Sequence, residues 1–409
     1  MLRRRSRAAF LGAGVLALSI LGTSTGSATV QPYEWGGPGK TAARTAFNWR
    51  SGFTATSLPN VTKAWGVGGG TFTPPVRVGS AIVAGDNGGT GRARLRAFDA
   101  ATGTVLWTKN FGADAITRVG APATNGSLVY VTVERATILG YIYDLYAYDI
   151  ADGDLAWSAE IGVANRKAGP RDVLFTGGRV LTPTASGNGF KRLAVYNATT
   201  GVWRYSVTPG GNISAFAANS AVMYVASSAA LEVYDLDTGS NVNTVFGGAG
   251  ATSIIVAASG IYTTIPSTST TPSRITHFDA TGFVLWSKAL DAGCSARARV
   301  LTAGMFGVSM SCASPATPVF YERGAPVLAM QPSDTTGGDR PIAAAREFII
   351  AIGASGQLKA WDTRNLRWGL PIAVPTLANP AVATGTGGAI LAFGQLIVPE
   401  RGGIEVFSL

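Results

Sequence analysis

Short segments of alternating apolar and polar residues recur along the whole chain, which is typical of half-buried β-strands. Leu95-Arg96-Ala97-Phe98 is one such segment, and Asp99 follows it directly. After the acidic residue comes a turn that contains Gly103, and then a second strand with Trp107. This order predicts antiparallel hairpins. The 53 glycines argue against long helices, because glycine favours turns.

The strand–turn–strand pattern returns seven times, at residues 95–107, 145–157, 193–205, 231–243, 275–286, 319–330 and 358–368. Its polar position falls 38 to 50 residues apart, at Asp99, Asp149, Asn197, Asp235, Asp279, Glu322 and Asp362. That interval matches one four-stranded blade of a β-propeller.

Each residue type that recurs in the copies has a physical role. The acidic side chain can accept backbone amides two residues on, and the glycine can take the positive φ that closes a hairpin. Four residues past the glycine, tryptophan can fill the space between neighbouring sheets. The predicted structural residues are Asp99, Gly103, Trp107, Asp149, Gly153, Trp157, Asp235, Gly239, Asp279, Gly282, Trp286, Asp362 and Trp368.

The two ends of the repeat array complement each other. Trp65 lies in residues 61–67 with no acidic turn before it, whereas Ile404-Glu405-Val406-Phe407 at the C-terminus has no second half. We therefore predict that the two segments form one last blade. The predicted fold is all-β, an eight-bladed propeller of four-stranded antiparallel blades, with the ring closed by pairing of the N-terminal and C-terminal strands.

The tandem motif Leu/Ile-x-Ala-aromatic-Asp-x-x-Thr-Gly-x-x-x-Trp resembles the repeats of the pyrroloquinoline-quinone-like (PQQ-like) β-propeller superfamily, over about residues 58–409. That superfamily includes quinoprotein alcohol dehydrogenases and the propeller lipoprotein of the Bam complex. The resemblance implies the fold, and it leaves the activity open because propellers host many functions.

The N-terminus has the pattern of a secretory signal peptide. Four arginines precede an apolar stretch at residues 8–21, and Gly26-Ser27-Ala28 fits a cleavage site. The alternative is an uncleaved anchor, but the stretch is shorter than the ~20 residues of a span. No cysteine lies near the cleavage site, so no lipid anchor is expected. The expected organisation is a signal peptide at 1–28, an N-terminal extension at 29–57 and the propeller at 58–409, in a secreted or extracytoplasmic protein.

Composition and charge restrict the partners. With 46% hydrophobic and 14% charged residues, the chain is typical of a packed globular protein. Loss of the four signal arginines lowers the formal charge from +10 to +6. This modest excess suits a protein or cell-envelope polymer as the partner, and it is too small to predict a nucleic-acid partner. No membrane span after signal cleavage is predicted, and a monomer is expected.

The two cysteines, Cys294 and Cys312, flank two β-rich arms that meet near Ala303-Gly304. Folding at that turn would place them opposite each other. The sequence therefore predicts a disulfide, which for a loop of this size contributes ~3 kcal/mol in the chain-entropy model. The alternative is two unpaired buried thiols.

Enzymatic chemistry finds little support in the sequence. The resemblance to quinoproteins implies a tryptophan floor, a disulfide between adjacent cysteines, a calcium ion and a catalytic Asp. Here the cysteines are 18 residues apart, and no acidic cluster indicates a calcium site. The single histidine, His277, lies in an expected strand and is interpreted as structural. We predict no catalytic residue, no cofactor and no metal.

Four arginines precede or begin the innermost strand of different copies: Arg118, Arg171, Arg297 and Arg340. In the superfamily these segments face the funnel mouth, where converging arginines could hold a carboxylate or phosphate. The alternative is ordinary solvated arginines, some of them paired with Asp172 or Asp339. The leading hypothesis is a secreted, non-enzymatic scaffold that binds a partner protein or envelope component there, with an anionic ligand as a candidate. The alternatives are a divergent quinoprotein-type oxidoreductase and a carbohydrate-binding propeller.

Overall fold

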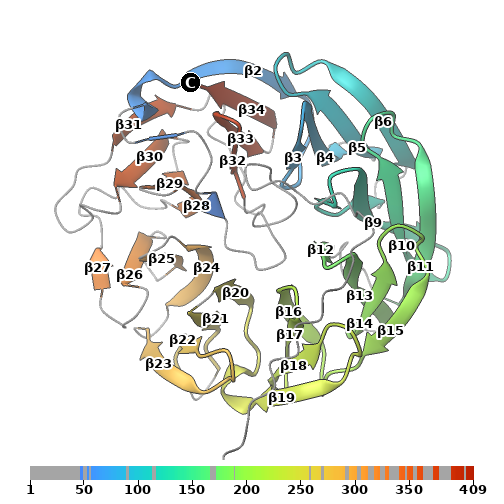
Figure 1. Ribbon diagram of the computed structural model, residues 1–409, viewed down its shortest axis with the longest axis vertical. Coiled ribbons are helices and arrows are strands. Elements are labelled where there is room, and N and C mark those ends of the chain that lie inside the picture. Colours follow the sequence, from blue (N-terminus) through green and yellow to red (C-terminus); the bar gives the residue numbers. More distant parts are fainter. Residues whose placement is uncertain are drawn as a thin grey trace, which may run out of the picture.

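β-Sheets surround a central axis in the computed structural model (Figure 1). Most of residues 57–301 are described, with gaps at 89–91, 113–116, 166–171, 188, 258, 269–270 and 291–293. Beyond residue 301 the described segments are 305–311, 317–322, 328–330, 340–345, 348–352, 357–362, 372–376, 388–399 and 402–409. Residues 47–48 and 53–54 complete the described part.

Five of the sheets have four antiparallel strands each. The first is β3 (Val76–Val78), β4 (Ala81–Gly88), β5 (Arg92–Asp99) and β6 (Val105–Gly112). Another is β16 (Ile213–Ala218), β17 (Val222–Ser227), β18 (Leu231–Asp235) and β19 (Asn241–Val245). The third is β20 (Ser253–Ala257), β21 (Gly260–Ile265), β22 (Arg274–Phe278) and β23 (Val284–Ala289). The fourth is β24 (Ser295–Leu301), β25 (Met305–Ser311), β26 (Thr317–Glu322) and β27 (Leu328–Met330). The fifth is β2 (Thr62–Gly68), β34 (Gly403–Ser408), β33 (Gln395–Pro399) and β32 (Ile390–Ala392).

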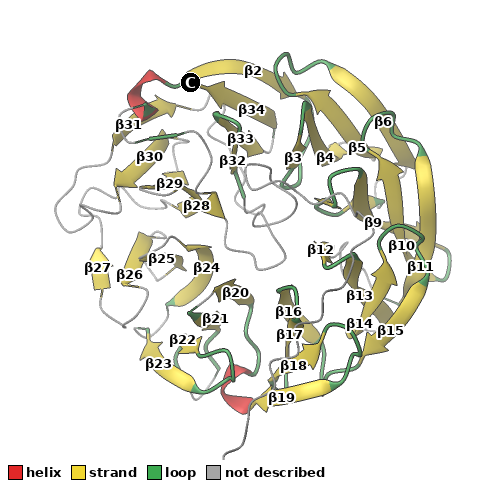
Figure 2. Cartoon of the chain, viewed as in Figure 1, coloured by secondary structure: helices red, strands yellow, loops and turns green. Residues whose placement is uncertain are grey.

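The remaining strands form two larger sheets. One has five strands, β1 (Phe47–Asn48), β28 (Arg340–Ala345), β29 (Phe348–Ile352), β30 (Gln357–Asp362) and β31 (Ile372–Thr376). The other has nine: β15 (Trp203–Val207), β14 (Gly189–Asn197), β13 (Arg179–Gly187), β11 (Leu155–Ala164), β10 (Gly140–Asp149), β9 (Leu128–Thr137) and β7 (Arg118–Val119), with β12 (Leu174–Thr176) on β13 and β8 (Ala123–Thr124) on β9. Two 3-10 turns, η1 (Leu58–Asn60) and η2 (Phe246–Gly248), are the helical elements of the described chain (Figure 2).

The prediction of a closed ring of eight four-stranded blades is wrong. Among the described strands only five sheets have that form, because segments expected to lie in separate blades share backbone hydrogen bonds. Gly162, Val163 and Ala164 of β11 pair in parallel with residues 185–187 of β13. This close approach requires a glycine, since a Cβ on Gly162 would lie 2.2 Å from the carbonyl oxygen of Ala185. β1 likewise adds in parallel to β28, although it belongs to the expected N-terminal extension.

Residues 62–68 and the C-terminal strand meet in one sheet. β2 pairs antiparallel with the C-terminal strand β34, with Trp65 opposite Val406 and Val67 opposite Ile404. Lys63 Nζ lies 2.6 Å from Glu405 Oε1 across the same pair. The C-terminus and β2 lie side by side at the top of Figure 1.

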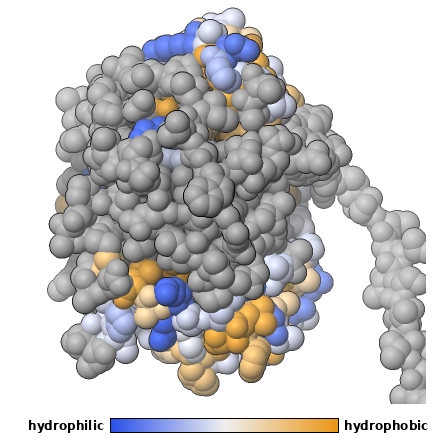
Figure 3. All heavy atoms as spheres, turned by 90° about the vertical axis from the view of Figure 1, so that its left-hand side faces the viewer, coloured by the Kyte–Doolittle hydropathy of each residue, from blue (hydrophilic) through white to orange (hydrophobic). Residues whose placement is uncertain are grey.

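The hydrophobic core lies between the faces of neighbouring sheets. Phe72 and Phe98, both fully buried, pack edge to face with ring centroids 5.9 Å apart. Apolar side chains also reach the surface. The outer segments around β19 and β23 expose Val242, Phe246, Phe283 and Leu285. Figure 3 shows an apolar area at the lower edge of the molecule, where β19 and β23 lie in Figure 1.

Candidate functional site

In several described repeats an acidic residue organises the turn that follows it. Asp99 Oδ1 accepts the amides of Ala101 and Thr102 at 3.0 and 2.9 Å. Asp235 makes the equivalent bonds to the amides of Asp237 and Thr238 at 3.0 and 2.8 Å. The backbone amide of Thr102 lowers the pKa of Asp99, and that of Thr238 lowers the pKa of Asp235, because both amides favour the ionised carboxylate.

Two other copies use the same turn with different donors or acceptors. Asp279 accepts the Thr281 hydroxyl at 2.7 Å and the Phe283 amide at 2.9 Å, and the hydroxyl contact is the main cause of its lowered pKa. Asn197 supports its turn with an uncharged amide oxygen, which accepts the amide of Thr199 at 3.0 Å. The turn therefore needs an acceptor oxygen at this position, and the negative charge is additional.

In four of the described turns the glycine lies under an aromatic ring from the preceding repeat. Gly103 and Gly201 have φ of +74° and +69°, and a Cβ on either would lie 2.6 Å from the indole of Trp65 or Trp157. The indole nitrogens then donate to the carbonyl that follows the acidic position. Trp65 Nε1 donates to Ala100 O at 2.9 Å, and Trp157 Nε1 donates to Ala198 O at 3.0 Å.

A β-bulge aims these rings. The strand registers shift by one residue just before the aromatic position, for example between Ala97 and Phe98, which pair with Trp107 and Val105. The same shift occurs in four more repeat hairpins, three with an acidic turn and one with the Asn197 turn. A bulge bends the outer strand and redirects its side chains. It therefore turns the aromatic ring towards the next repeat.

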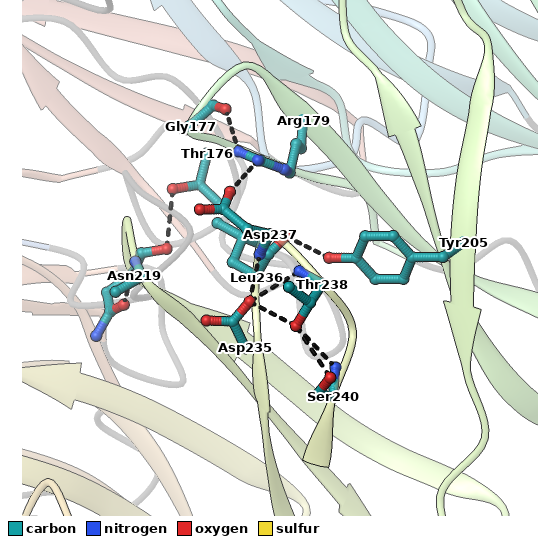
Figure 4. Close-up of polar contacts among 11 residues, drawn as sticks. Thr176, Gly177, Arg179, Tyr205, Asn219, Asp235, Leu236, Asp237, Thr238 and Ser240 are labelled. Atoms are coloured by element: carbon teal, nitrogen blue, oxygen red, sulfur yellow. Dashed lines mark hydrogen bonds and ion pairs between the residues drawn. The ribbon is translucent and has the colours of Figure 1, made fainter. Parts of the chain in front are cut away.

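Tyr205 takes the place of tryptophan in one copy, which the sequence interpretation missed. It lies four residues past Gly201, like the tryptophans of other copies, whereas Trp203 is 57% exposed. The Tyr205 hydroxyl donates to Leu236 O, and its ring lies against Gly239 (Figure 4). The spacing from the glycine identifies Tyr205 as the structural aromatic residue. Residue type alone would have selected Trp203.

The same junction holds a charged contact between turns, also drawn in Figure 4. Arg179 donates to Gly177 O at 2.7 Å and forms an ion pair with Asp237. Thr176 Oγ1 donates to Asn219 O at 3.2 Å. These contacts join β12–β13 to the adjoining sheet, so this end of the molecule is held by turn-to-turn bonds.

The predicted arginines begin or lie within first strands of different sheets. Arg118 begins β7, Arg297 lies in β24 and Arg340 begins β28, whereas Arg171 lies outside the described residues. β24 and β28 lie on the inner side of their sheets (Figure 1). Of the four side chains only that of Arg118 is described, and it is exposed. Convergence of the four guanidinium groups therefore stays a prediction.

The backbone around Arg118 is held firmly. Asn87 of β4 donates through Nδ2 to Val119 O at 2.9 Å and accepts the Val119 amide at 2.8 Å. Arg118 stands opposite Glu134 in the β7–β9 register. Glu134 is fully buried and accepts the Tyr143 hydroxyl at 2.8 Å. Within the described chain, no ion pair involves Arg118.

Two neighbouring arginines share one ion-pair partner instead. Asp86 is fully buried and pairs with Arg94 and, at 3.4 Å, with Arg96. Burial lowers the pKa of Arg96, whose guanidinium carbon also lies 4.8 Å from the Phe98 ring centroid. The sequence interpretation missed this cluster, although Arg92, Arg94 and Arg96 alternate along β5 and give a visible signal.

The other predicted positions are structurally varied. Trp107 and Gly153 form a contact like those above, with Nε1 donating to Ile150 O at 2.8 Å. Trp286 is buried beside His277, at a centroid distance of 5.6 Å. Asp149 accepts the Ala151 amide at 2.8 Å. Gly282 has φ of +86° and lies against Val245 rather than an aromatic ring. Asp362 ends β30, and Trp368 lies outside the described residues.

His277 is buried and stacked on Tyr262, with centroids 4.1 Å apart and an interplanar angle of 7°. Its Nε2 lies 3.0 Å from Ser259 O. Cys294 is buried, and Cys312 lies outside the described residues, so their disulfide stays a prediction. In the described part of the chain, no group of three or more His, Cys, Asp or Glu is placed to hold a metal ion. A helix long and apolar enough to cross a membrane is likewise not found among the described residues.

Comparison with known proteins gives one family and several solved folds. The model of the family described as outer membrane protein assembly factor BamB matches residues 42–188 and 143–303. BamB from Moraxella catarrhalis superposes with a TM-score of 0.57 and 16% identity, over 85% of this chain and 98% of that one. A quinohemoprotein alcohol dehydrogenase from Pseudomonas putida superposes with a TM-score of 0.64 and 12% identity, over 93% of this chain and 80% of that one. A computationally designed protein, Ika8, superposes with a TM-score of 0.59 and 11% identity, over 85% of this chain and 98% of that one. No curated protein matches the sequence.

Proposed function

The chain belongs to the PQQ-like propeller family described as outer membrane protein assembly factor BamB, and from this premise we propose that it is an extracytoplasmic, non-enzymatic scaffold. Its partner is a protein or cell-envelope component that presents an anionic group. The partner binds at the end of the molecule where Arg118 enters β7. BamB is by its name an assembly factor, and a rigid set of sheets that displays many loops suits such a role.

The observation that carries this proposal is the contrast between Arg118 and its neighbours. Asp86 forms ion pairs with Arg94 and Arg96, while Arg118 is exposed and has no ion pair within the described chain. Asn87 fixes the backbone beside it through two hydrogen bonds. A guanidinium on a fixed backbone loses little freedom when it binds a carboxylate or phosphate in bidentate geometry. Arg118, Arg297 and Arg340 would then contribute positive charge to one binding end.

The test is binding of a labelled poly-glutamate peptide at low and moderate salt. Arg118→Gln, alone and combined with Arg340→Gln, should weaken binding several-fold and flatten its salt dependence, because exposed charges are screened by salt. Arg204→Gln is the matched control, since Arg204 is an exposed arginine on the outer strand β15. Equal affinity and equal salt dependence in wild type and Arg118→Gln would overturn the proposed site.

Export is tested separately from binding. The proposed domain organisation, with a signal peptide at 1–28, an extension at 29–57 and the propeller at 58–409, requires that the mature chain begin at Thr29. N-terminal sequencing of the protein recovered outside the cytoplasm should give that residue. A chain that keeps its first residues and sediments with membranes would instead support an uncleaved anchor.

A further inference from the structure

The hairpin of β9 and β10 ends in two apolar side chains that face solvent. Both strands are ten residues long, whereas the corresponding strands β17 and β18 have six and five. Thr137 pairs with Gly140, so Ile138 and Leu139 alone form the turn. They are 101% and 85% exposed, the two highest values among the exposed large apolar side chains.

The turn itself does not require these residues. Gly, Asn, Asp and Ser dominate two-residue turns, because they tolerate unusual backbone angles or bond to the backbone. Ile138 and Leu139 supply neither property, and of the described non-glycine residues only Phe393 has a positive φ. Large exposed apolar residues at a projecting tip indicate a contact with something apolar outside this chain.

A second hairpin brings positive charge to the same end of the sheet. Tyr141, just behind the tip, pairs with Ala164 of β11, and Ala164 pairs in parallel with Gly187. The Asn165 amide also donates to Gly187 O at 2.9 Å. Gly187 ends β13, and β14 begins at Gly189. The parallel contact that merges the nine-stranded sheet therefore fixes the two hairpin tips beside each other.

Lys191 and Arg192 follow on β14, both exposed and without an ion pair in the described chain. Most of the acidic side chains at this end form an ion pair or a buried hydrogen bond. Asp144 pairs with Arg135 at 2.6 Å, and Glu134 is buried with Tyr143. Glu160, opposite Asp144, is an exposed carboxylate on this sheet. The balance of exposed charge near the two tips is thus positive.

We propose that this end of the nine-stranded sheet docks on an anionic phospholipid surface, with Ile138 and Leu139 inserted at the boundary between headgroups and acyl chains. Lys191 and Arg192 contact lipid phosphates. The half-buried Tyr141 lies just behind the tip, at the headgroup level that amphipathic aromatic residues prefer. The contact is peripheral and reversible, and apolar insertion and electrostatic attraction act together in it.

A lipid surface fits the tip better than a protein partner does. A stable protein interface buries about 800 Å² on each side, and a two-residue convex tip offers only a small part of that area. Shallow insertion into a bilayer needs no such area, and nearby cations strengthen it. This proposal goes beyond the scaffold function, because it uses a different set of side chains from the Arg118 site.

The experiment is co-sedimentation of the purified mature chain with vesicles of phosphatidylcholine alone or mixed in equal parts with phosphatidylglycerol. Wild type should bind the mixed vesicles, more weakly as salt rises, and should bind phosphatidylcholine poorly. Ile138→Ser with Leu139→Ser should weaken binding about tenfold or more, since removal of two inserted side chains costs most of the apolar contribution. Lys191→Gln with Arg192→Gln should weaken it and flatten its salt dependence.

Leu155→Ser is the matched control. Leu155 is 55% exposed on the same sheet, beside the Asp149 turn at the opposite end, so its loss should leave vesicle binding unchanged. Thermal melting of each variant checks the fold, and poly-glutamate binding distinguishes this site from that of Arg118. Absent binding to the mixed vesicles, or equal binding by the tip variant, would overturn the proposal. Loss of a protein partner in the tip variant without any vesicle binding would overturn it in favour of a protein contact.

Discussion

The indole of Trp107 lies against Gly153 of the next repeat and donates its Nε1 hydrogen to Ile150 O at 2.8 Å. Gly153 has φ of +76°, and a Cβ there would lie 2.8 Å from the ring. The glycine therefore serves two purposes at once, since it closes its own turn and leaves room for the preceding sheet. This relationship recurs between Trp65 and Gly103 and between Trp157 and Gly201, so it stabilises the contacts between successive repeats.

Gly153→Ala should destabilise the protein more than its backbone angle alone requires. A residue with a Cβ in the left-handed region costs roughly 1–2 kcal/mol, and displacement of a packed indole adds about 1–3 kcal/mol. Gly250→Ala is the control, because Gly250 has φ of +69° and no atom within 4 Å of the added Cβ. Equilibrium unfolding should show the larger loss for Gly153→Ala, and equal losses would contradict the packing role.

Tyr205→Phe should lower the free energy of unfolding by about 1 kcal/mol or somewhat more. The change removes the hydroxyl that donates to Leu236 O and leaves that carbonyl without this donor. Trp203→Ser is the comparison, since Trp203 is an exposed tryptophan on the same strand and should change stability by less than about 0.5 kcal/mol. A greater loss for Trp203→Ser would reverse the assignment of the structural aromatic.

Acid should destabilise the turns through Asp99, Asp235 and Asp279. Hydrogen bonds lower the pKa of each carboxyl from its ordinary value of 3.8, so the ionised form is favoured in the folded state. Their contribution is present above that value and is lost as the pH falls through the lowered folded pKa. Replacement of all three by Asn should flatten the fall of Tm below about pH 4. Asn197 shows that an amide oxygen supports the same turn, and an unchanged acid limb would refute the role of these carboxyls.

Deletion of residues after Gly402 should cause aggregation or a large loss of stability. It removes β34, which lies between β2 and β33, and leaves the backbone groups of both neighbours unpaired. Trp65 would also lose the strand beside it. The readouts are thermal melting and size-exclusion chromatography, with deletion of Leu409 alone as the control, because Leu409 is the exposed residue after β34. A truncated chain that melts like the full chain would refute a structural role for β34.

The predicted disulfide is tested by mass spectrometry of unreduced protein, which should show one Cys294–Cys312 crosslink. The β24–β25 register supports the crosslink, because Ser295 pairs with Ser311. Cys294 directly precedes Ser295 in the sequence, and Cys312 directly follows Ser311. Cys294→Ser should then lower stability by about 3 kcal/mol in the chain-entropy model. Alkylation of both thiols in the native protein would refute the crosslink.

Local periodicity was sufficient to predict the strands, the acidic turns and the superfamily. Alternation in a segment such as residues 95–98 and an acceptor such as Asp99 act within a few residues, so the sequence carries them directly. The same reasoning placed Trp107 and Trp157 against the next repeat along the chain. It did not find Tyr205, where the spacing from a glycine outweighs residue type, nor the buried pairing of Asp86 with Arg94 and Arg96.

The sequence by itself determined which segments are strands, where they turn and which family they join, because those properties depend on neighbours along the chain. Tertiary structure decided which backbones share a sheet. Gly162 permits the approach of β11 to Ala185 that merges nine strands, and a glycine in the sequence does not say what it approaches. It also decided which side chains remain unpartnered. In the sequence, Ile138 and Leu139 resemble ordinary apolar residues of a strand. The pairing of β9 with β10 places them in a turn at a tip that is exposed to solvent.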